Sequence, residues 1–218
     1  MKKLSLIAIS ALLMASCASE PSKENTTETN TTQTSTEESC TYSYDQSSSK
    51  IKWTSFKTSD KVAVGGTFDT FTVNNTVSAD NETAVFENAS FKIITSSINS
   101  GNPGRDSKLI SYFFNTMIST DTISGKVLML DKPDNGKGTA LIAITMNNMT
   151  FNQKAEFTLE NDVLTLSATL ILNRWDGNAA IETLNNECKD LHTGADGISL
   201  LWNEVNVEIS TTLAKDCK

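Results

Sequence analysis

The stretch VLTLSATLILNRW, residues 163–175, alternates apolar and polar side chains along most of its length. Leucine or alanine occupies every even position from 164 to 172, and threonine, serine or asparagine fills most of the odd positions. Successive side chains of a strand point to opposite faces of its sheet, so this period of two predicts a half-buried β-strand. One face of that strand belongs to the core.

The same alternation recurs on both sides of this stretch. Residues 153–160 and 205–213 repeat it, and further strands are predicted at 42–45, 50–57, 62–73, 84–96, 121–130 and 139–149. Turns rich in glycine, proline and asparagine separate these segments. Many short antiparallel strands, each with one apolar face, predict an all-β sandwich or a closed barrel.

Two segments break the strand pattern. Residues 105–117 place Leu109, Tyr112 and Phe113 at helical spacing, and Asp106 is the expected N-cap. Residues 175–202 form a long connection, in which a short helix is predicted around residues 179–184. Long connections of this kind are usually functional.

The N-terminus has the features of an export signal. An apolar run of about 11 residues, 4–14, follows Lys2 and Lys3, and it is too short to span a bilayer as a helix. The sequence Met14-Ala15-Ser16-Cys17 then matches the processing site of a bacterial lipoprotein, with Cys17 as the acylated residue. The alternative is an ordinary secretory signal with an incidental cysteine. We expect residues 1–16 to be the signal peptide.

Residues 17–39 are expected to form a disordered tether behind the lipidated Cys17. Beyond that cysteine they consist almost entirely of Ser, Thr, Asn, Glu and Gln, so they bury too little apolar surface to fold. Residues 40–218 are then long enough for one domain with a substantial core. These features predict a lipid-anchored protein of the cell envelope, at the outer membrane and facing the periplasm or the cell surface.

Charge argues against some partners. The formal net charge is −8, and the basic residues are scattered singly along the chain. Such a chain is repelled by nucleic acids and by anionic lipid surfaces, so we expect no nucleic-acid partner. Membrane contact is expected through the N-terminal lipid anchor. The sequence identifies no protein partner.

Catalytic chemistry has little support. His192 is the single histidine, and no nucleophile-elbow motif accompanies it and Asp190. Cys188 and His192 offer two metal ligands, whereas a closed site needs about four. We therefore expect no catalytic residue and no metal site, and we expect Cys188 and His192 to be exposed loop residues.

The cysteines predict one disulfide. With Cys17 acylated, Cys40, Cys188 and Cys217 remain in an oxidising compartment, so one thiol is left over. A bond between Cys40 and Cys217 would join the first and last strands of a closed barrel. Cys188–Cys217 is the competing pair, and Cys40–Cys188 is the third alternative.

Several short motifs together resemble one family. They are Gly66-Thr67-Phe68-Asp69-Thr70-Phe71, Phe91-Lys92-Ile93, Ser97-Ile98, Arg105-Asp106, Leu109 and Phe113-Phe114. In order and spacing they are similar to the YceI-like polyisoprenoid-binding family. The resemblance implies an eight-stranded antiparallel lipocalin-like barrel with a short helix near its mouth and a long helical or loop insertion before the last strand. It also implies an apolar tunnel for an isoprenoid lipid, such as a quinone or a polyprenyl phosphate, and no cofactor or catalysis.

The inward-facing candidates for such a tunnel are almost all apolar, which suits a hydrocarbon ligand. They are Phe68, Phe91, Ile93, Phe113, Phe114, Ile142, Ile144, Met146, Phe157, Leu166, Leu170 and Leu172. A barrel of about eight strands is either filled by side chains or holds one slender ligand. If it is filled, the protein is a non-enzymatic interaction lipoprotein of the surface or periplasm.

Arg105 has two interpretations. Its guanidinium could bind a pyrophosphate or quinone head group at the barrel mouth. The alternative, which we favour from the sequence, is an Arg105–Asp106 pair that fixes the start of the helix, with Asp106 as its cap.

Overall fold

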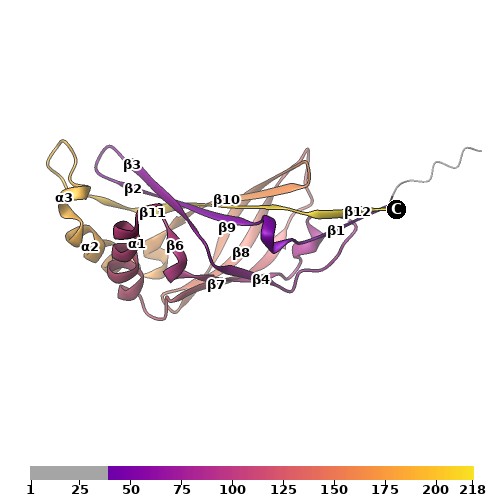
Figure 1. The fold of residues 1–218 in the computed structure, drawn as a ribbon, viewed down its shortest axis with the longest axis horizontal. Coiled ribbons are helices and arrows are strands. Elements are labelled where there is room, and N and C mark those ends of the chain that lie inside the picture. Colours follow the sequence, from indigo (N-terminus) through magenta and orange to yellow (C-terminus); the bar gives the residue numbers. More distant parts are fainter. Residues whose placement is uncertain (1–38) are drawn as a thin grey trace, which may run out of the picture. The chain divides into compact units, whose positions relative to one another are not determined.

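The computed structural model describes residues 39–218, which form a strongly curled antiparallel sheet with helices gathered at one end (Figure 1). The strands are β1 (Cys40–Ser43), β2 (Lys50–Lys57), β3 (Val62–Phe68), β4 (Phe71–Asn74), β5 (Ser90–Ile94), β6 (Ile98–Asn99), β7 (Thr122–Leu130), β8 (Lys137–Met146), β9 (Met149–Glu160), β10 (Val163–Ile171), β11 (Leu201–Thr212) and β12 (Ala214–Cys217). The α-helices are α1 (Pro103–Lys108), α2 (Asn178–Glu187) and α3 (Lys189–His192). The predicted signal peptide, Cys17 and the tether up to residue 38 lie outside the described residues.

Ten strands pair in the order β4-β5-β7-β8-β9-β10-β11-β2-β3-β6. The predicted strand 62–73 breaks at Asp69 and Thr70 into β3 and β4, and β5 and β6 are likewise joined by the short 3-10 turn Thr95–Ser97. Backbone hydrogen bonds connect the two broken segments, from Asp69 N to Ser97 O and from Ile94 N to Thr70 O, each 3.0 Å long. Counted as continuous segments, these strands close an eight-stranded antiparallel barrel, as predicted.

The alternating stretch at residues 163–175 forms β10. It pairs with β11 from Val163↔Thr212 to Ile171↔Glu204. The strand ends four residues earlier than predicted, because Leu172–Trp175 form a 3-10 turn. That turn buries the Trp175 ring completely, and its Nε1 donates a hydrogen bond of 3.0 Å to the carbonyl of Ile144.

The segment 84–96 also differs from the prediction. It begins with the 3-10 turn Ala84–Phe86, and β5 starts at Ser90. Val85 and Phe86 are adjacent in the chain and both buried. A strand cannot bury two successive side chains on one face, so this part of the segment leaves the sheet.

The predicted helix 105–117 is present but begins earlier. Helix α1 starts at Pro103 and continues through the π-helical turn Leu109–Phe113 and the 3-10 turn Phe114–Thr116. Its N-cap is Asn102, whose side chain accepts a hydrogen bond of 3.0 Å from Arg105 N. Pro103 is suited to the first helical turn because it lacks an N–H and has a fixed φ. The prediction of Asp106 as the cap was therefore wrong.

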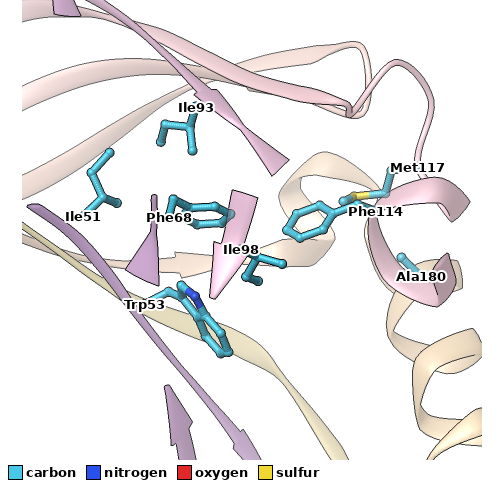
Figure 2. Close-up of a cluster of buried hydrophobic side chains, with 8 residues drawn as sticks. All are labelled: Ile51, Trp53, Phe68, Ile93, Ile98, Phe114, Met117 and Ala180. Atoms are coloured by element: carbon cyan, nitrogen blue, oxygen red, sulfur yellow. The ribbon is translucent and has the colours of Figure 1, made fainter. Parts of the chain in front are cut away.

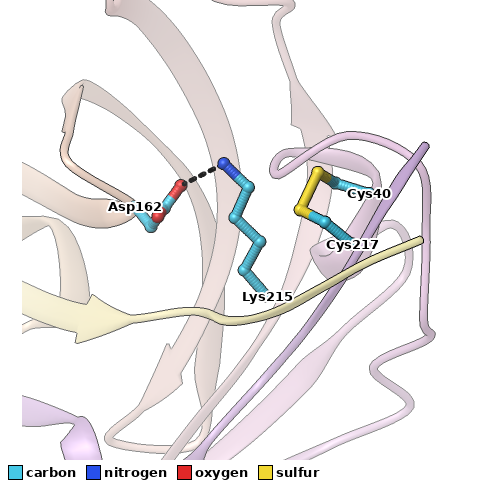
Figure 3. Close-up of a disulfide and its surroundings, with 4 residues drawn as sticks. All are labelled: Cys40, Asp162, Lys215 and Cys217. Carbon is cyan, nitrogen blue, oxygen red and sulfur yellow. Dashed lines mark ion pairs between the residues drawn. A yellow bond between two sulfur atoms is a disulfide. The ribbon is translucent and has the colours of Figure 1, made fainter. Parts of the chain in front are cut away.

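A two-stranded ribbon extends from the other end of the described domain (Figure 1). Strands β1 and β12 pair from Cys40↔Cys217 to Ser43↔Ala214, and a disulfide joins Cys40 to Cys217 (Figure 3). Beside it, Lys215 forms an ion pair of 3.8 Å with Asp162. Cys188 is left as a free thiol. Of the three pairings considered from the sequence, the structure has the one that joins the first strand to the last.

Side chains from the barrel and from the helical end pack into a common core (Figure 2). Ile51, Phe68 and Ile93 converge from three strands, while Phe114 and Met117 reach in from the segment after α1. The predicted insertion before the last barrel strand is present as α2 and α3. Within residues 39–218, no helix is long and apolar enough to cross a membrane.

Candidate functional site: the barrel interior

An apolar cavity of about 100 Å³ lies inside the barrel next to the helices, and we call it the helix-end cavity. Its walls come from β2, β3, β6, β7, β8, β10, β11 and the helical segments. They include Trp53, Phe68, Ile98, Leu109, Phe113, Phe114, Ile123, Met146, Leu170, Leu172, Ile181, Leu184, Leu201, Trp202, Val205 and Val207. Ser55 is the one aliphatic hydroxyl in this lining. The walls therefore offer dispersion contacts and very little hydrogen bonding.

A second apolar cavity, of about 90 Å³, lies toward the β1–β12 ribbon, and we call it the ribbon-end cavity. Its lining includes Tyr44, Ile51, Phe71, Val73, Phe86, Phe91, Val127, Leu130, Ala140, Ile142, Leu164, Leu166 and Ile209. An engineered apolar cavity of about 150 Å³ is large enough to bind benzene. Each cavity has about two thirds of that volume, so it has room for only a short piece of hydrocarbon, and a long tail requires side chains to move.

The predicted cavity residues fall into three groups. Phe68, Phe113, Phe114, Met146, Leu170 and Leu172 line the helix-end cavity. Phe91, Ile142 and Leu166 line the ribbon-end cavity. Ile93, Ile144 and Phe157 face inward but are buried in packed side chains and line neither cavity.

Several wall residues were not among the candidates. Trp53 and Ile51 on β2, and Val205, Val207 and Ile209 on β11, line one cavity or the other. Alternation within the predicted strands 50–57 and 205–213 could have identified them, because these residues occupy the apolar positions of each strand. The contribution of α2 through Ile181 and Leu184 had no comparable signal, since it depends on how the insertion folds back.

A third cavity, of about 330 Å³, adjoins the helix-end cavity, and we call it the basic chamber. Trp53, Ser55, Leu109, Leu184 and Leu201 line both cavities. Three cations, Lys57, Arg105 and Lys108, also line the chamber, together with Asn102 and His192, whereas no carboxylate is among its lining residues. Lys108 is ion-paired with Glu187 at 3.7 Å, and Lys57 and Arg105 form no ion pair with a described residue, so the chamber still places positive charge at one end of an apolar cavity.

Arg105 itself is half-buried on α1. No residue of 39–218 forms a hydrogen bond or ion pair with its guanidinium. Asp106 instead accepts hydrogen bonds from Ser100 N, at 2.9 Å, and from Ser100 Oγ, at 2.6 Å. The expected Arg105–Asp106 pair is therefore absent from the described structure, because the Asp106 carboxylate is directed to the chain before the helix.

Cys188 and His192, expected to be exposed, are both buried, because α2 and α3 fold over the barrel end. His192 Nδ1 lies 2.9 Å from Asn185 Oδ1. Burial, and then the positive charges of Lys57 and Lys108, lower the pKa of His192 to about 4. Burial raises the pKa of the Cys188 thiol. Both groups are therefore uncharged at neutral pH, and the charge of the chamber comes from its lysines and Arg105.

A family model described as the YceI-like domain matches residues 42–213, which is most of the chain. The chain belongs to the YceI-like family. No curated protein matches it.

Solved structures share the fold of this YceI-like chain. Burkholderia cenocepacia BcnA matches with a TM-score of 0.53 and 12% identity, over 78% of this chain and 99% of that one. A polyisoprenoid binding domain from Saccharophagus degradans, implicated in plant cell wall breakdown, matches with a TM-score of 0.53 and 14% identity, over 83% and 99%. A mutant Campylobacter jejuni YCEI protein matches with a TM-score of 0.50 and 18% identity, over 70% and 85%.

The interior of this YceI-like domain is suited to binding an apolar chain. Among residues 39–218, no three His, Cys, Asp or Glu side chains are grouped so that they could hold a metal ion. The chamber can neutralise an anionic group, and the two cavities can surround hydrocarbon. Together they fit an amphiphile whose charged end lies at the helices.

Proposed function

We propose that this protein binds a long-chain isoprenoid lipid inside its barrel, for sequestration or transport in the cell envelope. The observation that carries the proposal is the pair of apolar cavities, with the basic chamber adjoining one of them. Apolar walls with few polar groups favour a hydrocarbon ligand over a sugar or a nucleotide. The polyisoprenoid binding domain from Saccharophagus degradans, which has the same fold, supports the ligand class.

For the head group, the chamber favours a polyprenyl phosphate over a quinone. Lys57, Arg105 and Lys108 line one small volume in a protein whose net charge is −8. Guanidinium and ammonium groups form charge-assisted hydrogen bonds with phosphate oxygens, whereas a quinone offers two neutral carbonyls. Arg105, with no partner among the described residues, is the group we assign to the phosphate.

Native mass spectrometry with lipid extraction tests this proposal. The full chain carrying Cys17→Ser would be purified from an oxidising compartment without detergent. We expect a co-purifying prenyl lipid, or uptake of an added polyprenyl phosphate. A protein that is empty, and that also refuses added quinones and polyprenyl phosphates, would overturn the proposal.

We further propose that Cys17 is acylated and that the protein is anchored to the outer membrane, facing the periplasm or the cell surface. Support comes from the sequence: the short apolar run, Met14-Ala15-Ser16-Cys17, and the polar segment that follows.

A second candidate function is a non-enzymatic interaction lipoprotein with a filled barrel. The small cavity volumes favour it, as do two exposed apolar side chains on the insertion, Leu191 and Ile198. The lipid-binding experiment above separates the two, because a filled barrel takes up no prenyl lipid.

A further inference from the structure

The two apolar cavities lie end to end inside one barrel, and a layer of side chains separates them on one wall. On β8, Ile142 lines the ribbon-end cavity and Met146 the helix-end cavity, while Ile144 between them lines neither. On β7, Val127 lines the ribbon-end cavity and Ile123 the helix-end cavity, and the inward position between them is Gly125. This intervening layer is absent from the opposite wall.

On that opposite wall the cavities adjoin directly. Ile51 lines the ribbon-end cavity, and the next inward position on β2, Trp53, lines the helix-end cavity. On β11, Ile209 lines the ribbon-end cavity, and the next inward position, Val207, lines the helix-end cavity. Since inward positions recur every second residue, no inward side chain lies between them on these two strands.

The separating layer is built on one cross-strand row. Phe91 pairs with Gly125 across β5 and β7, and Gly125 pairs with Ile144 across β7 and β8. The Phe91 ring lies directly over Gly125, where a Cβ atom would collide with it. Phe91 lines the ribbon-end cavity, and it also packs against two side-chain clusters that include Trp53 and Met146 of the helix-end lining. Its ring therefore stands between the two cavities.

We propose that Phe91 and Ile144 form a waist that determines how long an apolar tail the barrel accepts. The inference rests on the proposed function, and it names the residues that limit the length of the bound lipid tail. A short tail occupies the helix-end cavity alone. A longer tail reaches the ribbon-end cavity by displacing the Phe91 ring from Gly125, so part of the affinity gained from burying further methylene groups is lost in moving the ring.

The test compares prenyl alcohols of increasing length, geraniol, farnesol and geranylgeraniol, by equilibrium titration with the full chain carrying Cys17→Ser. Tryptophan fluorescence reports binding, because Trp53 lines the helix-end cavity. Phe91→Ala removes the waist. We expect it to raise the affinity ratio of geranylgeraniol to geraniol by about tenfold or more, since the longer tail no longer displaces a ring.

Phe71→Ala is the matched control. Phe71 is also a partly buried phenylalanine lining the ribbon-end cavity, but it does not lie on Gly125. For Phe71→Ala, we expect the affinity ratio of geranylgeraniol to geraniol to stay within about twofold of the ratio measured for the protein with its waist intact. If Phe91→Ala fails to fold, Ile144→Ala opens the same layer from the other side of Gly125, with the same expected gain for the longer alcohol.

The outcomes separate the two proposals. An unchanged length profile in every waist variant overturns the waist and leaves lipid binding intact. An equal gain for Phe71→Ala also overturns it, because added volume anywhere would then suffice. If none of the proteins binds any of the three alcohols, the waist is overturned, and the uptake of polyprenyl phosphates and quinones described above decides lipid binding separately.

Discussion

At the residue scale, Arg105 is the clearest candidate for recognising a ligand head group. The residue is partly buried in the lining of the basic chamber, and no residue of 39–218 forms a hydrogen bond or ion pair with its guanidinium. An anionic ligand in the basic chamber would supply the missing interaction.

Replacing Arg105 with alanine is expected to weaken binding of farnesyl phosphate by on the order of tenfold to a hundredfold, since a hydrogen bond between charged groups is lost. Binding of farnesol, which carries no charge, should change little. Arg105→Lys is the control, because it keeps the charge. Fluorescence titration measures the affinities and a thermal melt checks the fold. An equal loss for both ligands would mean that Arg105 supports the helix and not the phosphate.

His192 makes the stability of the domain depend on pH. Its pKa falls from 6.5 to about 4 on folding, because burial and the charges of Lys57 and Lys108 disfavour the imidazolium. Between these two values the unfolded chain binds the proton and the folded one does not, so the free energy of unfolding rises with pH. The contribution of His192 is fully present above pH 6.5 and is lost as the pH falls toward 4.

The expected loss from His192 between pH 7 and pH 4 is on the order of 2 kcal/mol, allowing for solvent screening through the basic chamber that it lines. Urea denaturation at the two pH values measures it, with His192→Gln as the reference. Carboxylates also titrate over this range, but they do so in both proteins, so the difference isolates the histidine. Equal losses in both proteins would show that His192 is not held neutral by the fold.

At the scale of elements, local patterns in the sequence predicted the strands well. The alternation of Leu164, Leu166 and Leu170 is a property of β10 alone, and it identified both the strand and its inward face. The break at Asp69 was not predictable in this way. Its carboxylate accepts hydrogen bonds from Thr67 Oγ1, at 3.0 Å, and from Asn99 Nδ2, at 2.8 Å, and the second partner lies thirty residues away.

The candidate site shows the same limit. Alternation indicated that Phe91 and Ile144 face inward, but whether an inward residue lines a cavity or fills the core depends on its neighbours across the sheet. For Phe91 the neighbour across the sheet is Gly125, whose missing side chain leaves the space that the Phe91 ring occupies. Likewise, the burial of Cys188 and His192 follows from how the insertion packs, for which a single sequence carries no local signal.

The Cys40–Cys217 disulfide joins β1 to β12. These two strands form a two-stranded sheet that is separate from the sheet of the barrel. The bond spans 177 residues, so the chain-entropy model gives a stabilisation of about 5 kcal/mol. Cys40→Ser with Cys217→Ser is therefore expected to lower the free energy of unfolding by up to about that amount, measured by urea denaturation.

Ligand binding should survive this change, because neither cysteine lines a cavity. Cys188→Ser is the matched control, since it removes the free thiol and leaves the ribbon joined. A double variant as stable as the parent protein would show that the paired strands hold the ends together without the bond.

At the scale of the whole molecule, charge is distributed unevenly. The chain carries a net charge of −8, while the lining of the basic chamber contains three cations and no carboxylate. Overall repulsion from anionic surfaces and local attraction for an anionic head group therefore act together. For the lipid-binding function that we propose, this arrangement favours uptake of single lipid molecules over adsorption of the protein to a membrane face.

If Cys17 is acylated as we propose, the acyl chains are expected to hold the protein at the membrane. Cys17→Ser is expected to move the protein from the membrane fraction to the soluble fraction and to abolish labelling by an alkyne fatty acid, because the acyl chains supply the apolar surface that holds it. Prenyl lipid binding and thermal stability should stay unchanged, since the cavities lie within residues 39–218. Fractionation and labelling of both proteins measure this. A variant that remains in the membrane fraction without label would mean that the folded domain itself binds a membrane or a membrane protein, and the exposed Leu191 and Ile198 would then be the first residues to replace.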